Sequence, residues 1–580
     1  MVSPSIKPPA TFLKAVFQSL RKAFFSMGLA SAVINLLALT GSMFMLQVYD
    51  RVLPGRSVPT LLGLALIAAV LFAFQGVLEL LRSLMLARIG VSLDQRLNRG
   101  VFRSLVGPPV NKSASNDGLQ SVRDLDQVRT FLSGPGPTAL FDLPWMPLYI
   151  AVCFLFHFWI GVTALGGALV LVALAALAEF LSHRPARMAA QFSSQRFGFA
   201  EDARRNWESI TAMGFADRLA DRWSDMSNAY FSTQLKAANI VSLLTASSRV
   251  LRMMLQSGVL AVGAFLVIRQ EATGGIIIAS SILVSRALAP VELSIGQWRG
   301  FAAARQSWSR LVKLLDGASQ TSREVKLPAP KSALSVENLT VAAPGKRDLV
   351  LRSVSFSLDA GSILGVIGPS ASGKTSLARA LAGLWPSAIG AVKLDQAALA
   401  QWDPAERGRH IGYLPQDVRL LDGSIAENIS RFEPDAPSEA ILAAADAAGI
   451  TDMIVNLPDG FDTRIGEGAA MLSAGQRQRV ALARALYGAP FLVILDEPNS
   501  NLDADGEAAL AQALAGVRAR GGIAVVVAHR PSVLAVADRI LVLATGQMQA
   551  FGPRDAVLGK IARTPAPGSF RVTYGKDLAS

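Results

Sequence analysis

Residues 368–375 read Gly-Pro-Ser-Ala-Ser-Gly-Lys-Thr, a glycine-rich turn that ends in a lysine and a hydroxyl residue. An apolar run at residues 363–367 precedes the turn, and a helical pattern starts near Ser376. A loop that leads from a strand into a helix presents unpaired backbone N–H groups and the positive end of the helix dipole to a phosphate. The pattern therefore predicts a P-loop, which binds the phosphates of ATP.

All residues of this loop, with the first residue after it, are predicted to contact the phosphates. They are Gly368, Pro369, Ser370, Ala371, Ser372, Gly373, Lys374, Thr375 and Ser376. We expect Lys374 to reach the β- and γ-phosphates and the Thr375 hydroxyl to ligate Mg²⁺. ATP and Mg²⁺ are therefore the predicted cofactors.

The apolar run at residues 493–497 ends in two adjacent acids, Asp496 and Glu497. Two acids after an apolar strand are also consistent with a solvated strand end. In a chain with a P-loop they fit better as a metal-binding acid and a general base, because hydrolysis needs a group that takes a proton from the attacking water. We therefore expect Asp496 to hold Mg²⁺ through water and Glu497 to act as the base.

The order of the motifs resembles the nucleotide-binding domain of ATP-binding-cassette transporters. Leu-Ser-Ala-Gly-Gln, at residues 472–476, lies between the P-loop and the acidic strand. The resemblance implies a signature loop, in which Ser473 and the Gly475 backbone, with Gln476 beside them, cap the γ-phosphate of ATP bound to another subunit. It also implies a homodimer, because each ATP then needs a P-loop from one chain and a signature loop from its mate. Ala474 replaces a common glycine of this loop with another small residue.

The same resemblance assigns roles to further residues. Gln416, after Tyr-Leu-Pro, matches the Q-loop that meets the metal and the coupling helices, and Asp503 matches the D-loop that links the two ATP sites. His529 ends an apolar strand and matches the histidine that contacts the γ-phosphate, although a lone histidine is more often a core residue. Ala343 stands where the family usually stacks an aromatic side chain on adenine, so we expect weaker nucleotide binding.

The composition indicates a membrane protein with a soluble end. Of the 580 residues, 51% are hydrophobic and 17% are charged, whereas roughly 25% are charged in soluble domains. The net charge of +13 comes from basic residues that crowd between apolar stretches, as the positive-inside rule expects of cytoplasmic loops. Because no basic motif with interleaved aromatic residues accompanies the charge, nucleic-acid binding is disfavoured. The one cysteine, Cys153, excludes an intrachain disulfide.

Six apolar runs are long enough to cross a bilayer core, which takes about 20 residues. They lie near residues 24–46, 61–81, 139–157, 160–181, 251–268 and 274–291. The basic segment ahead of the first run predicts a cytoplasmic N-terminus. Pro8 and Pro9 argue against a long leading helix. Two long charged connections, with tips expected at 108–120 and 206–213, would then also be cytoplasmic.

These features divide the chain into segments. They are a cytoplasmic N-terminal segment (1–22), a transmembrane domain (23–318), a linker (319–332), an ATPase domain (333–560) and a tail expected to be disordered (561–580). Alternating strands and helices in the ATPase domain predict a largely parallel α/β core. The predicted fold is a six-helix all-α transmembrane domain fused to an α/β P-loop nucleotide-binding domain. The six spans with long inner loops match the type IV exporter architecture of the resembled family.

Motifs in the membrane half resemble one branch of this family more specifically. They are Leu-Gln-Val-Tyr-Asp-Arg-Val-Leu-Pro at 46–54, Arg-Asp-Leu-Asp at 123–126, Phe-Asp-Leu-Pro-Trp-Met-Pro at 141–147 and Arg-Ala-Leu-Ala-Pro at 286–290. With Asp-Glu-Pro-Asn-Ser-Asn-Leu-Asp at 496–503, they resemble the protease-secretion, PrtD-like branch of type I secretion ATPase/permeases. The resemblance implies an inner-membrane ATPase that joins a periplasmic adaptor and an outer-membrane channel. Together these would export an unfolded protein with a C-terminal signal.

Two other classes of protein remain open on this evidence. A lipid or drug flippase uses the same exporter fold, and the ATPase motifs do not separate it from a protein exporter. A cassette protein that uses ATP for assembly or signalling is the second alternative, which six fused spans disfavour. Arg286, inside the sixth span, either faces a water-filled path or extends its guanidinium to the cytoplasmic surface.

Overall fold

The structure is a computed structural model that describes residues 9–106, 120–318, 327–343, 348–466, 472–528 and 534–563. The chain divides near residue 320 into two compact units, a helical unit followed by an α/β unit. Of the two expected loop tips, the one at 108–120 lies outside the described residues except for Gln120. The tail at 561–580 also lies outside them, apart from the last turn of α20 (Arg554–Arg563).

The helical unit consists of long helices joined by short turns. Its elements are α1 (Pro9–Leu37), α2 (Thr40–Gln47), η1 (Val48–Val52), α3 (Leu53–Gly55), α4 (Val58–Val106), α5 (Gln120–Ser133), α6 (Gly136–Asp142), η2 (Leu143–Trp145), α7 (Met146–Phe156), α8 (Phe158–Arg205), α9 (Trp207–Ala212), α10 (Ala216–Ile268) and α11 (Gly274–Ala318).

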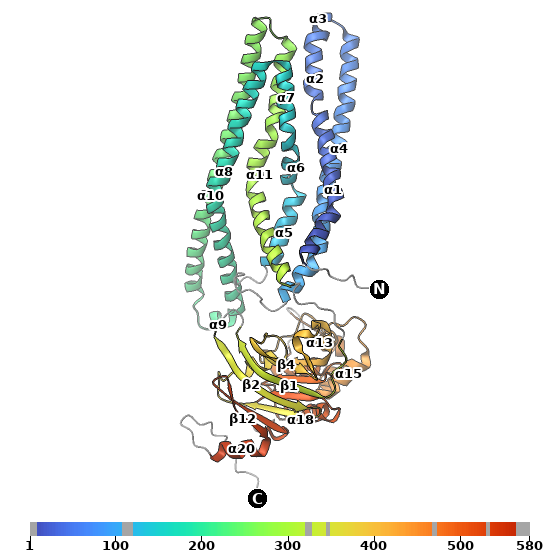
Figure 1. Ribbon diagram of the computed structural model, residues 1–580, viewed down its shortest axis with the longest axis vertical. Coiled ribbons are helices and arrows are strands. Elements are labelled where there is room, and N and C mark those ends of the chain that lie inside the picture. Colours follow the sequence, from blue (N-terminus) through green and yellow to red (C-terminus); the bar gives the residue numbers. More distant parts are fainter. Residues whose placement is uncertain are drawn as a thin grey trace. The chain divides into compact units, whose positions relative to one another are not determined.

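Six stretches among the described helices are long and apolar enough to cross a membrane, which confirms the predicted six-helix transmembrane fold. They are Arg21–Gly55, Val58–Val106, Gly136–Phe156, Phe158–Arg205, Ala216–Ile268 and Gly274–Leu315. Within this unit, α8 and α10 pack along each other and diverge from the other helices toward α9 (Figure 1).

The start of the first helix differs from the expectation. The proline pair was expected to prevent a long leading helix, but α1 begins at Pro9 and continues to Leu37. Proline is tolerated in the first turn of a helix because the N–H groups there have no partner within the helix. Proline, which would break a helix in its interior, therefore starts α1 at Pro9.

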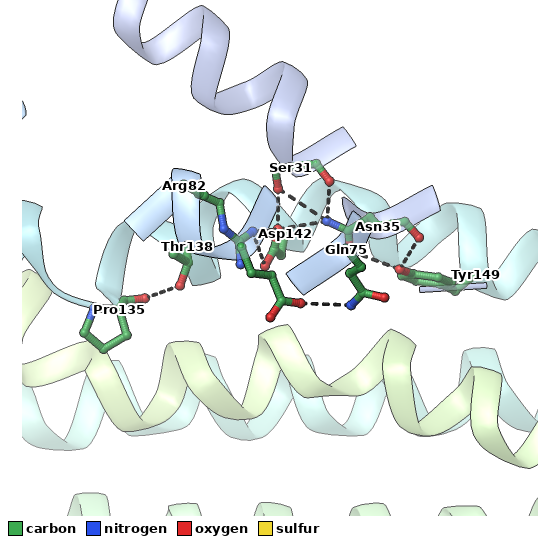
Figure 2. A network of polar contacts seen from close by, with 9 residues as sticks. Ser31, Asn35, Gln75, Arg82, Pro135, Thr138, Asp142 and Tyr149 are labelled. Atoms are coloured by element: carbon green, nitrogen blue, oxygen red, sulfur yellow. Dashed lines mark hydrogen bonds and ion pairs between the residues drawn. The ribbon is translucent and has the colours of Figure 1, made fainter. Parts of the chain in front are cut away.

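A carboxylate at the end of α6 contacts two other helices directly and a third through Asn35. Arg82 of α4 places Nη1 2.9 Å from Asp142 Oδ1, and Asn35 Nδ2 of α1 donates to the same oxygen at 2.8 Å. Ser31 of α1 also donates to it, and Tyr149 of α7 donates to the Asn35 carbonyl at 2.7 Å. Figure 2 shows Ser31, Asn35 and Arg82 around Asp142, with Tyr149 next to Asn35. A partly buried carboxylate needs such donors to offset its loss of water.

Two more aspartates make contacts of the same kind. Asp50, in η1, accepts from the Gly275 N–H at 2.8 Å and from the Thr273 hydroxyl at 2.6 Å, at the start of α11. Asp124 of α5, which is 3% exposed, accepts from Arg310 Nε of α11 at 2.8 Å. Each of the three aspartates lies in a different motif of the membrane half, so these motifs fix how the helices pack.

The α/β unit is built on two main sheets. Its strands are β1 (Ala333–Ala342), β2 (Leu349–Asp359), β3 (Ile363–Ile367), β4 (Ile389–Leu394), β5 (Ala397–Ala398), β6 (Ile411–Leu414), β7 (Gly423–Ser424), β8 (Arg464–Ile465), β9 (Leu492–Asp496), β10 (Ile523–Val527), β11 (Arg539–Ala544) and β12 (Gln547–Pro553). Its α-helices are α12 (Lys374–Leu381), α13 (Pro404–His410), α14 (Ile425–Ile429), α15 (Ser438–Ala447), α16 (Thr451–Val455), α17 (Ala474–Leu486), α18 (Ala504–Ala519) and α20.

The larger sheet has the order β12-β11-β3-β10-β9-β6, in which only β12 is antiparallel to its neighbour. The smaller sheet, β2-β1-β4-β5, is antiparallel. All residues of β9 and β10 are buried, as expected for parallel strands that are covered on both faces. Because β3, β6, β9 and β10 run in the same direction, the residues that follow them meet at one edge of the sheet.

Candidate functional site

The glycine-rich loop runs from the end of β3 to Gly373, which caps the N-terminus of α12. Gly368 has a φ of +155° and Gly373 a φ of +101°. A Cβ on Gly368 would lie 2.0 Å from Leu543 O, and one on Gly373 would lie 2.9 Å from Leu351 Cδ2. Both the backbone conformation and the available space therefore require glycine at these ends of the loop.

The loop between these glycines has an exposed tip and a buried end. Pro369, Ser370 and Ala371 are exposed, whereas Ser372 and Ser376 are buried. The exposed tip leaves backbone N–H groups accessible in front of α12, which is the arrangement that binds phosphate.

Lys374, the first residue of α12, folds back over the loop. Its side chain is largely buried, and Nζ donates to Gly368 O and Pro369 O, both at 2.9 Å. Burial lowers the pKa of Lys374, and the charges of Glu497 and Asp496 oppose that shift. The ammonium group thus interacts with Asp496, the last residue of β9, and with Glu497, which follows it.

Thr375 and Asp496 form a donor set that fits Mg²⁺. The Thr375 hydroxyl lies 3.3 Å from Asp496 Oδ1, and Asp496 is 1% exposed. Its other oxygen, Oδ2, has no hydrogen-bond partner among the described residues. Burial raises the pKa of Asp496 to about 6, while the Thr375 hydroxyl opposes the shift. Mg²⁺ is commonly held by one or two protein oxygens together with substrate phosphates, so an unpaired carboxylate oxygen next to a hydroxyl suits it.

Glu497 follows β9 in a strained backbone conformation. Its φ is +53°, and its N–H donates to Val527 O of β10 at 3.0 Å. Gln416, which follows β6, donates from Nε2 to Glu497 Oε2 at 3.0 Å. A left-handed residue other than glycine costs about 1–3 kcal/mol and is typical of functional sites. The sheet edge therefore brings together the P-loop and the predicted Gln416, Asp496 and Glu497.

The signature loop is not brought to the P-loop of its own chain. Ser473 is the N-cap of α17: its hydroxyl accepts from the Gln476 N–H at 3.2 Å, and Gln476 Oε1 accepts from the Ser473 N–H at 2.8 Å. In the described part of the chain, no hydrogen bond joins either residue to the loop at 368–376. Gly475 packs instead on the segment after β9, because a Cβ there would lie 2.8 Å from Asn501 O.

The structure describes two of the three remaining predicted residues, Asp503 and Ala343. Asp503 is the N-cap of α18, where it accepts from the Gly506 N–H at 2.9 Å. Ala343 follows β1 and is partly buried, with residues 344–347 outside the described ranges. His529 also lies outside them, directly after β10 and Ala528.

Gln478 was missed by the sequence analysis. It lies on α17, is 3% exposed, and its Oε1 accepts from the Asn501 N–H at 3.2 Å. The other buried residues of α17 are apolar, so a glutamine at one of these positions is the signal that could have pointed to Gln478.

The fold and this sheet edge define a nucleotide-hydrolysing domain fused to a six-helix membrane domain. Residues 351–500 match the family model described as ABC transporter, and residues 24–290 match the model described as ABC transporter transmembrane region. The chain belongs to the ABC transporter family, and it couples ATP hydrolysis to transport.

Its relatives identify the branch. The type I secretion system ATP-binding protein PrsD of Rhizobium meliloti (strain 1021) is 55% identical over 95% of this chain and 94% of that protein. The leukotoxin translocation ATP-binding protein LktB of Mannheimia haemolytica is 30% identical over 94% of this chain and 78% of that protein. These relatives confirm the predicted resemblance to type I secretion ATPases.

A solved structure shares the fold. It is a bacterial Atm1-family ABC exporter with ATP bound, which matches with a TM-score of 0.82 over 93% of this chain and 97% of that one, at 23% identity. The exporter fold predicted from the sequence is therefore confirmed.

Proposed function

We propose that the protein is the homodimeric ATPase and permease of a type I secretion system in the bacterial inner membrane. Its cargo would be an unfolded protein with a C-terminal secretion signal. The observation that carries the proposal is the 55% identity to PrsD, because it extends over 95% of the chain and so includes the membrane half. ATPase motifs are common to all cassette proteins, whereas the membrane half contacts the cargo.

The geometry of the signature loop supports a dimer. Ser473 and Gln476 contact each other at the N-terminus of α17, and among the described residues neither has a hydrogen bond to the P-loop of the same chain. A second copy of the chain would bring its own signature loop to the γ-phosphate. Asp503, which caps α18, would then lie in the segment that links the two sites.

We assign a role in hydrolysis to each predicted residue at the sheet edge. Lys374 and the loop N–H groups hold the phosphates, and Thr375 and Asp496 would hold Mg²⁺, which neutralises phosphate charge when bound. Glu497 takes the proton from the attacking water. Gln416 orients the Glu497 carboxylate through the 3.0 Å hydrogen bond between them. We assign the γ-phosphate contact to His529.

Topology and partners follow from the same proposal. The basic segments between spans support a cytoplasmic N-terminus and a cytoplasmic ATPase domain. Exposed apolar side chains on α4, such as Leu62, Leu66 and Val70, would contact membrane lipid. A periplasmic adaptor and an outer-membrane channel would complete the export path.

A lipid or drug flippase is the second candidate, and it rests on the fold shared with the Atm1-family exporter. Arg286 is exposed on α11. In a protein exporter it would line a polar path, and the alternative is that its guanidinium extends to the cytoplasmic surface.

Reconstitution into lipid nanodiscs and vesicles tests both candidates. The probe is the C-terminal segment of a protein encoded beside this one, compared with the same segment in scrambled order. Protein export predicts that only the native segment binds and stimulates ATP hydrolysis, with no ATP-dependent lipid flipping. Lipid flipping with no response to either segment would replace the export proposal by the flippase.

A further inference from the structure

Gln478 connects the signature helix to the turn that follows β9. Its Nε2 donates to Glu497 O at 3.3 Å and to Pro498 O, and its Oε1 accepts from the Asn501 N–H at 3.2 Å. The side chain is 3% exposed. An amide has two N–H donors and one carbonyl acceptor, so this buried group is satisfied by backbone atoms of a single turn.

A second contact supports the same connection one helical turn earlier. Gly475 lies so close to the turn that a Cβ would be 2.8 Å from Asn501 O. Because α17 continues from Ala474 to Leu486 without interruption, Gly475 and Gln478 move together with Ser473 at its N-cap. The signature helix therefore contacts the turn after β9 at two positions, Gly475 and Gln478.

The turn in question holds the group that the mechanism needs. Glu497 is in the left-handed region with a φ of +53°. Its N–H donates to Val527 O, and its carbonyl accepts from Gln478 Nε2 and from the Ser500 N–H, both at 3.3 Å. Since the side-chain direction of Glu497 depends on that backbone, a small displacement of α17 changes where its carboxylate points. Catalytic groups that are displaced by about 1 Å lose about two orders of magnitude in rate.

We propose that Gln478 is a positioning residue that makes the orientation of Glu497 depend on whether the signature loop of the same chain has bound ATP. The inference rests on the proposed homodimer, in which Ser473 contacts the ATP held by the other subunit. ATP bound to the P-loop of the other subunit then contacts Ser473 and displaces α17. Because Gln478 on α17 bonds to the backbone of Glu497 in its own chain, this displacement changes the position of the base at the other ATP site. The two ATP sites are thereby coupled through the Gln478 contact of each subunit rather than through the membrane domain.

Mixed dimers of the full-length chain test this coupling directly. One subunit carries Lys374→Ala, so its P-loop does not bind ATP and the signature loop of the test subunit stays unengaged. The other subunit, called the test subunit, is first wild type. Turnover per intact site in this mixed dimer should be at least about fivefold lower than in the wild-type homodimer, because about fivefold is the lower end of usual allosteric couplings. With Gln478→Met in the test subunit, turnover per site should be equal, within about twofold, in the mixed dimer and in the Gln478→Met homodimer.

Two further variants separate coupling from stability. Thr340 of β1 is a buried polar residue that also accepts from a backbone group, the Ser353 N–H at 3.2 Å, and β1 packs on β2 and β4. Thr340→Val should lower the unfolding temperature as Gln478→Met does, yet keep the wild-type ratio of turnover per intact site between the mixed dimer and the homodimer. Gln478→Glu keeps the acceptor for Asn501 and should behave as Gln478→Met, because it presents an oxygen to two carbonyl groups.

The outcomes distinguish this inference from the function on which it rests. The deciding quantity is turnover per intact site in the mixed dimer divided by that in the matching homodimer. If this ratio is the same for Gln478→Met and for the wild type, or if it is near one for the wild type, the inference is overturned and protein export is not affected. A purified chain that forms no dimers, mixed or otherwise, overturns the homodimer and the coupling together.

Discussion

Arg82 of α4 and Asp142 of α6 form an ion pair in which Nη1 lies 2.9 Å from Oδ1, with side chains only 12% and 18% exposed. Ser31 and Asn35 of α1 donate to the same carboxylate, so three helices that are far apart in the sequence meet at one group. Asp142 belongs to the motif at residues 141–147, whose resemblance to the secretion branch gave no hint of this contact.

Removal of one charge from this pair should destabilise the helical unit more than removal of both. Asp142→Leu leaves the Arg82 guanidinium without its partner, and breaking a buried pair in this way costs about 3–5 kcal/mol, with less expected here because the pair is partly exposed. The double variant Arg82→Met with Asp142→Leu should recover much of the lost unfolding temperature, measured on detergent-solubilised protein. Glu179→Gln is the control, because its pair with Arg305 is long at 3.7 Å and more exposed. Equal losses in the single and double variants would show that the charges do not interact.

Glu497→Gln should trap the ATP-bound dimer. The amide still pairs with Gln416 but takes no proton from water, so turnover should fall by a factor of about 10²–10⁴ while ATP binding stays within about twofold. Glu439→Gln, an exposed acid in the first turn of α15, should leave both unchanged. Steady-state hydrolysis and binding of a fluorescent ATP analogue give the two quantities, and turnover near the wild-type rate would exclude Glu497 as the base.

Mg²⁺-dependent nucleotide binding should weaken below about pH 6. The pKa of Asp496 is raised to about 6, so the carboxylate that would ligate Mg²⁺ becomes protonated as the pH falls through that value. Affinity for ATP with Mg²⁺ should therefore drop between about pH 7.5 and pH 5.5, whereas the affinity measured with a chelator should change less. An equal change in both would place the titrating group elsewhere.

The same shift predicts a stability effect of Asp496→Asn. A carboxyl whose pKa is higher in the folded protein keeps its proton more tightly there, so folding is progressively disfavoured as the pH rises from about 4 to about 6. Replacement by the neutral amide removes this cost. Asp496→Asn should raise the unfolding temperature of the nucleotide-free protein at about pH 7.5 and raise it less at about pH 5.5. A lower unfolding temperature at both pH values would contradict the burial effect.

Ala343→Tyr should tighten ATP binding if adenine stacks at the end of β1. Aromatic stacking contributes about 0.5–1.5 kcal/mol beyond burial, which is a gain of about two- to tenfold in affinity. Pyrophosphate, which has no base, should bind both proteins equally. An unchanged affinity for ATP would mean that another residue stacks on the base.

Much of the fold could be predicted from local patterns. The six apolar runs predicted the six membrane helices because length and hydropathy are local properties of a span. The glycines of the P-loop and the acids after β9 were likewise found from their spacing, and the family comparisons confirm an ABC ATPase domain there. Pro9 was misinterpreted because the effect of proline depends on its position within the helix, which the residue pair alone does not reveal.

The sequence by itself therefore determined the two kinds of domain, the ATP-binding motifs and the branch of transporters, since each depends on residues that are close together in the chain. Only the tertiary structure decided which residues serve one another: Gln416 reaches Glu497 across 81 positions, and Gln478 reaches the turn after Glu497 across about 20. It also showed that Asp50, Asp124 and Asp142 each join separate helices. Such contacts form because parallel strands end at a common edge and buried polar groups must find partners, wherever in the chain those partners lie.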